Sequence, residues 1–91
     1  MADILKIKNS EITVPATANT VDDASLVRLI NTSSDTNFTI TQKYANGDTI
    51  GTFTIGFAGT DESVVYLMKE PTETIEVNSG TSVKGVSVAF Y

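Results

Sequence analysis

Apolar and polar residues alternate along most of this chain, and short polar clusters interrupt the alternation. Between residues 24 and 31, for example, Val27 and Leu29 share one face, and Arg28 lies on the other. Successive side chains of a strand point to opposite faces, so this period predicts β-strands. The same pattern predicts strands over residues 4–8, 11–14, 24–31, 37–44, 50–57, 63–69, 72–77 and 83–91.

Turn residues separate these segments. Asn46-Gly47 predicts a tight hairpin between two strands because both residues tolerate positive φ. About seven short strands at this spacing are typical of a sandwich, so we expect an all-β, immunoglobulin-like antiparallel β-sandwich. The absence of repeats and low-complexity tracts predicts a single domain over residues 1–91.

The strand predicted over 63–69 is apolar on both faces, with Val65 and Leu67 on one side and Val64, Tyr66 and Met68 on the other. A strand of this kind is either central in its sheet or has its second face covered by a neighbour.

The N-terminal segment 1–14 is short, prone to β-structure and separated from the rest by the loop 15–23. Pro15 ends it, since proline cannot donate to a strand ladder. We expect this segment to act as an arm or edge strand that either pairs with its own domain or docks on an adjacent subunit.

The composition removes most catalytic chemistry. The chain has no His, Cys or Trp, so it lacks imidazole and thiolate ligands and the usual base for a Ser nucleophile. Asp22-Asp23 and Asp61-Glu62 are better explained as turn residues and caps than as an acid pair. We therefore expect neither an enzyme nor a cofactor. Calcium is the one metal whose oxygen ligands the turns offer, but no known loop motif is matched by Asn46, Asp48, Asp61 and Glu62.

The net charge of −5 and the six dispersed cations disfavour binding to nucleic acid or to anionic membranes. No signal peptide and no membrane-spanning segment is predicted, so we expect a protein that is made in the cytoplasm and stays there or leaves within a larger assembly.

From residue 24 to residue 91, the chain resembles small virion structural proteins of tailed bacteriophages, especially those that infect cyanobacteria. The resemblance rests on Val27–Asn31, the Thr-rich strands around Asn46-Gly47, the stretch Val64–Ile75 with its Lys69-Glu70-Pro71 corner, and Val83-Lys84 with Val88–Tyr91. It implies a non-enzymatic capsid decoration or accessory protein that is located in the virion. Its partners would be capsid or tail subunits, and it would form homo-oligomers.

Two loops are the candidate contact sites for such partners, because loops and edges are exposed in a sandwich. The candidate interface residues are Asn31, Thr32, Asp35, Asn37, Glu70, Pro71 and Glu73. An alternative function is a ligand- or carbohydrate-binding module of a tail fibre or surface protein. That alternative predicts that Tyr44, Tyr66 and Tyr91 line one exposed groove.

Overall fold

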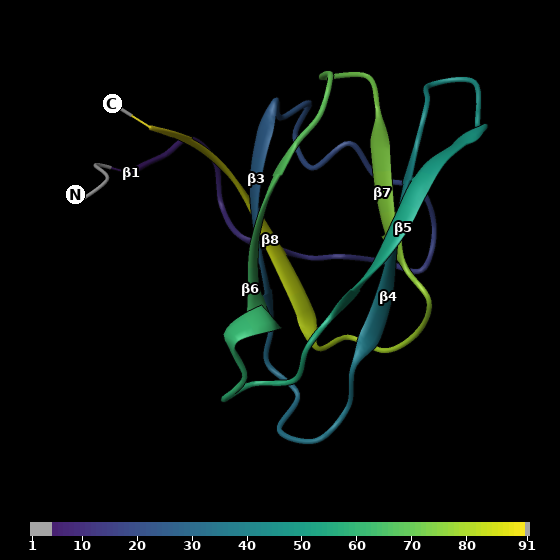
Figure 1. The fold of residues 1–91 in the computed structure, drawn as a ribbon. Helices are drawn as coiled ribbons and strands as arrows, with labels where there is room; N and C mark the ends of the chain where they lie inside the picture. Colours follow the sequence, from purple (N-terminus) through teal and green to yellow (C-terminus); the bar gives the residue numbers. More distant parts are fainter. Residues whose placement is uncertain (1–4, 91) are drawn as a thin grey trace.

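Two antiparallel β-sheets pack face to face (Figure 1). The computed structural model describes residues 5–90. Its strands are β1 (Leu5–Ile7), β2 (Ile12–Thr13), β3 (Leu26–Asn31), β4 (Phe38–Lys43), β5 (Thr49–Ile55), β6 (Val64–Met68), β7 (Thr74–Val77) and β8 (Val83–Phe90), with one 3₁₀ turn, η1 (Asp61–Ser63). The predicted all-β sandwich is confirmed.

The core lies between the sheets, where the apolar positions of the alternating strands meet. Leu29 of β3, Ile40 of β4 and Ile75 of β7 are completely buried. The outward neighbours of these residues are partly exposed, which is the burial pattern that period-2 alternation predicts. The Asn46-Gly47 hairpin is also confirmed, with Gly47 at positive φ and its N–H donating to the carbonyl of Tyr44.

One sheet has the strand order β1-β8-β3-β6, with β2 also pairing with β8, and the other has the order β5-β4-β7. An immunoglobulin sandwich places its last strand in the sheet of β4 and β7. Here β8 instead pairs with β3, from Val27↔Ser87 to Asn31↔Val83. This order corresponds to a small jelly roll, the double Greek-key form of the β-sandwich.

The N-terminal segment is part of the domain. Both β1 and β2 pair with β8, and the N–H of Val14 donates to the carbonyl of Val83 at 2.9 Å. Val14 is completely buried in the core. Of the two predicted roles for the segment, its described part, residues 5–14, therefore pairs with its own domain.

A strand that is apolar on both faces is expected in the centre of its sheet or under a covering neighbour, but β6 has neither position in the described part of the chain. The strand lies at the edge of its sheet and pairs only with β3 among residues 5–90. Val65 and Leu67, which the sequence places on one face, pack against the core. The opposite side chains, Tyr66 and Met68, point away from the core and are exposed. No other strand of the described chain covers them.

Candidate interaction surface

The outer face of the β1-β8-β3-β6 sheet is predominantly apolar. The register fixes which side chains share it. Arg28 lies between Val86 and Tyr66, and Leu26 lies opposite Met68. Ile7 lies opposite Val88 on the far side of β8. We call this surface the apolar face, and it comprises Ile7, Leu26, Arg28, Ile30, Val64, Tyr66, Met68, Lys84, Val86 and Val88.

Three large side chains of this face are exposed. Met68 is 80% exposed, Ile7 68% and Tyr66 46%. The other sheet provides an internal comparison, because its outer face carries the cross-strand pairs Thr39↔Thr54 and Thr41↔Thr52. Threonine is an ordinary residue for a solvated sheet face, whereas a cluster of exposed large apolar residues marks an interaction site.

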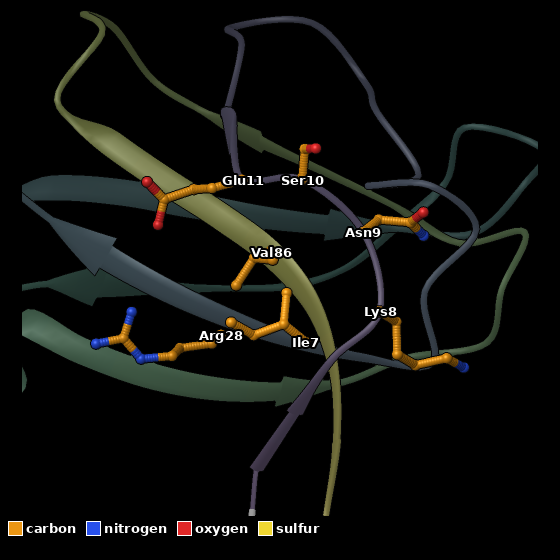
Figure 2. A pocket seen from close by; sticks show the side chains of 7 residues that line it. All are labelled: Ile7, Lys8, Asn9, Ser10, Glu11, Arg28 and Val86. Carbon is orange, nitrogen blue, oxygen red and sulfur yellow. The ribbon is translucent and has the colours of Figure 1, made fainter.

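An open depression of about 780 Å³ lies on the apolar face beside β8. Val86, which is only 6% exposed, forms part of its lining, with Arg28 on one side. The segment that connects β1 to β2 forms the other side and contributes Glu11 (Figure 2). The side chain of Ile7 points toward Val86, and the charged ends of Glu11 and Arg28 reach toward the same side of the depression (Figure 2).

The charges of this face are mostly positive. Lys8 and Arg28 line the depression. Lys84 lies two residues before Val86 on the same face of β8, and its Nζ donates to Thr13 Oγ1 at 2.7 Å. Glu11 is the one carboxylate of the depression's lining. Lys8, Arg28 and Lys84, which are dispersed in the sequence of this acidic chain, are therefore brought together on one sheet.

The predicted interface loop after β3 is held by its own side chains. Asn31 is completely buried; its Nδ2 donates to the Thr36 carbonyl at 2.9 Å, and its Oδ1 accepts the Ser33 N–H at 3.0 Å. The side chain of Asn31 thus shapes the loop from inside and offers no contact surface. Thr32, Asp35 and Asn37 are exposed.

The predicted interface corner after β6 is organised around Glu73 and Lys69. Glu73 Oε1 accepts the N–H of Glu70 at 2.8 Å and Nε2 of Gln42 at 3.2 Å. Lys69 is buried, and its Nζ donates to the carbonyls of Glu70 at 3.3 Å and Pro71 at 3.4 Å. Burial lowers the pKa of Lys69, and the nearby carboxylates of Asp23 and Glu73 oppose that shift. Glu70 and Pro71 themselves are exposed.

The two predicted loops do not form one surface. Because Ile30 pairs with Val64 and Leu26 pairs with Met68, the loop after β3 and the corner after β6 lie at opposite ends of the sandwich. Figure 1 shows them at the bottom and the top of the molecule. A contact through both loops would therefore need two separate partners or one that spans the domain.

Replacing Asn31 tests the structural role that its burial indicates. We expect Asn31→Ala to lower the free energy of unfolding by about 1–2 kcal/mol, since both hydrogen bonds of the amide are lost from a buried position. Asp35→Ala, in the same loop but exposed, should cost no more than about 0.5 kcal/mol. Urea denaturation followed by circular dichroism measures both values; equal costs would contradict the role of Asn31.

The residues considered for other sites are spread over the molecule. Tyr44 lies at the end of β4 and Tyr66 on β6, so these two exposed tyrosines belong to different sheets; Tyr91 lies outside the described residues. Within residues 5–90, no three acidic side chains gather where they could hold a metal ion. Asn46 and Asp48 share the β4–β5 turn, and Asp61 and Glu62 belong to η1.

Scans against protein-family models, curated proteins and solved structures gave no match to this chain. Over the described residues, the one helical segment is far too short to cross a bilayer.

The sequence contains one local signal of the apolar face but does not show where the face lies. The two-sided apolar character of 63–69 was visible as a pattern. The sequence does not show that Ile7, Glu11 and Arg28 belong to this face, because their positions depend on the pairing of β1, β2 and β3 with the distant strand β8.

Proposed function

We propose that this protein is a non-enzymatic virion structural protein, of the capsid decoration or accessory kind, that buries its apolar face against neighbouring subunits of the particle. The observation that carries the proposal is the exposure of Met68, Tyr66 and Ile7 together on the outer face of one sheet. The outer face of the other sheet carries threonine pairs, and its exposed large apolar residues, Ile50 in β5 and Tyr44 after β4, lie outside those pairs. Contact with neighbouring subunits would remove this apolar surface from water, at about 25 cal/mol for each Å² buried.

The sequence provides further support. A chain without His or Cys has little to offer for catalysis but needs none of these residues for packing. The resemblance of residues 24–91 to small phage virion proteins indicates the class of assembly. The jelly-roll order agrees with this choice, since viral capsid domains often use that fold, although the fold alone does not assign a function.

Particle composition tests the proposal. The proposal implies that a phage genome encodes this chain. Quantitative peptide mass spectrometry of purified particles of that phage should then find the protein at a high and fixed number of copies relative to the major shell subunit. Its absence from purified particles would overturn the proposal.

A matched pair of variants tests the surface. Particles made with Met68→Glu should contain at least about tenfold less of this protein, because a charge cannot be buried unpaired in an apolar contact. Thr52→Glu places the same charge on the outer face of the other sheet and should leave incorporation unchanged. Both variants should keep the wild-type unfolding midpoint, since both side chains are exposed. Equal incorporation of the two variants would contradict a role for the apolar face.

A further inference from the structure

Two opposite charges on the apolar face lie on either side of Val86. Arg28 and Val86 are paired neighbours on β3 and β8. On the other side of β8, Ile12 pairs with Gly85, so Glu11, one residue earlier, lies alongside Val86. One acid and one base therefore flank Val86 from opposite sides.

Glu11 and Arg28 do not neutralise each other within the subunit. Two strand spacings separate their backbones, a distance of about 10 Å. No ion pair shorter than 4.0 Å joins the two side chains, both of which belong to the described residues. Each charge is therefore available to a partner that offers its opposite.

The adjacent row of the face has a matching apolar arrangement. Ile7 lies opposite Val88 on one side of β8. On the other side, Leu26 is one step beyond the pair Val27↔Ser87 and is itself paired with Met68. Apolar side chains thus flank Val88 from both sides, the exposed Ile7 on one and the half-buried Leu26 on the other, as the charges flank Val86.

We propose that the apolar face binds the same face of a second copy of this chain, about a two-fold axis that runs along β8 between the two sheets. This proposal rests on the proposed function and names the neighbouring subunit. A rotation about this axis exchanges the β3 side of β8 with the β1 and β2 side, but it leaves the position of each residue along β8 unchanged. Arg28 then meets Glu11 of the second copy, and Glu11 meets its Arg28. By the same rotation, Ile7 lies against Leu26 of the second copy, next to Met68 of that copy. Such reciprocal contacts are what a two-fold interface requires.

The size of the face sets the strength of the contact. Four strands spaced about 4.8 Å apart, each contributing about five residues of 3.3 Å, give roughly 300 Å² in projection. Such a contact falls below the roughly 800 Å² per partner that is standard for a stable complex, so we expect a dissociation constant of roughly 0.1 mM. A contact of this strength forms when many copies are held close together, as they are on a particle.

Charge exchange in the isolated protein tests the inference. Sedimentation equilibrium of the 9.7 kDa chain at increasing concentration should show reversible dimerisation. Arg28→Glu and Glu11→Arg should each weaken it at least about tenfold through repulsion between like charges. The double variant Arg28→Glu/Glu11→Arg should recover the wild-type dissociation constant to within about threefold, because the reciprocal pairs are restored with the signs exchanged.

Control variants separate this effect from net charge. Lys43→Glu makes the same charge change as Arg28→Glu, but Lys43 lies on the other sheet, where it pairs with Glu76 at 2.9 Å, so dimerisation should be unaffected. Amide shifts that change with concentration in NMR spectra should map to Ile7, Arg28 and Met68. Shifts confined to the Thr52–Thr54 side, or a double variant as weak as the single variants, would overturn the inference.

The outcomes also separate this inference from the proposed function. A chain that is monomeric up to about 1 mM, tenfold above the expected dissociation constant, would exclude the two-fold contact. If that monomer is nonetheless abundant in purified particles, the structural role stands with another subunit on the apolar face. A dimer that shows the charge-exchange pattern but is absent from particles would leave the contact standing and remove the virion role.

Discussion

Val14→Asp is expected to unfold this protein. Val14 is completely buried among the core side chains, and its backbone N–H is bonded to Val83, so the new carboxylate has no route to water while the strand pairing holds. A charge buried in an apolar core without a partner costs at least about 4 kcal/mol, which approaches the total stability of about 5–15 kcal/mol that is usual for a domain. Circular dichroism and urea denaturation should therefore find little or no folded protein at 25 °C.

The adjacent residue supplies the control. Thr13 is exposed on β2, and its Oγ1 accepts a hydrogen bond from Lys84 Nζ. In Thr13→Asp the new carboxylate meets that ammonium group, and the free energy of unfolding should stay within about 0.5 kcal/mol of wild type. The comparison decides whether the N-terminal segment is part of the core or a detachable arm. A detachable arm would leave Val14→Asp as stable as Thr13→Asp.

The local pattern of the chain predicted the strands because their alternation is a local property. Val27 and Leu29 were assigned to the face opposite Arg28, and the structure buries the first two in the core. The hairpin at Asn46-Gly47 was equally predictable, since positive φ at a turn is set by the residues that form it. The class of fold follows from such segments, and the sandwich was therefore predicted correctly.

The connectivity and the apolar face depend on distant pairings that no local pattern contains. Whether the last strand joins β3 or β7 is decided by which sheet buries its apolar residues best, and a period-2 pattern fits either sheet. For the same reason, Glu11 and Arg28 could not be placed on either side of Val86. Asn31 was predicted as an exposed contact because Asn favours turns. The structure shows that such a residue can direct both of its hydrogen bonds inward.

Glycine within a strand is a weaker local signal that the structure explains. Gly85 of β8 pairs with Leu29 on one side and Ile12 on the other. A Cβ at this position would lie 3.2 Å from a methyl carbon of Leu29, 3.3 Å from one of Val14 and 3.4 Å from one of Val27. Gly51 of β5 is also a strand glycine, but a Cβ there would meet nothing within 4 Å. The core side chains of Leu29, Val14 and Val27 therefore leave little room for a side chain at residue 85, whereas residue 51 has open space.

Valine at each of these positions should have opposite effects. Gly85→Val forces a branched side chain into the filled space between the sheets, and we expect the free energy of unfolding to fall by about 1–3 kcal/mol. Gly51→Val adds a residue that favours strands at an exposed site and removes the backbone freedom of glycine, so stability should rise by up to about 1 kcal/mol. Urea midpoints measure both changes. If Gly85→Val were as stable as wild type, β8 and the core side chains that surround Gly85 would have to shift easily. The apolar face depends on β8 to position Val86 between Glu11 and Arg28, so a β8 that moved this freely could not hold the charge pattern that the two-fold contact needs.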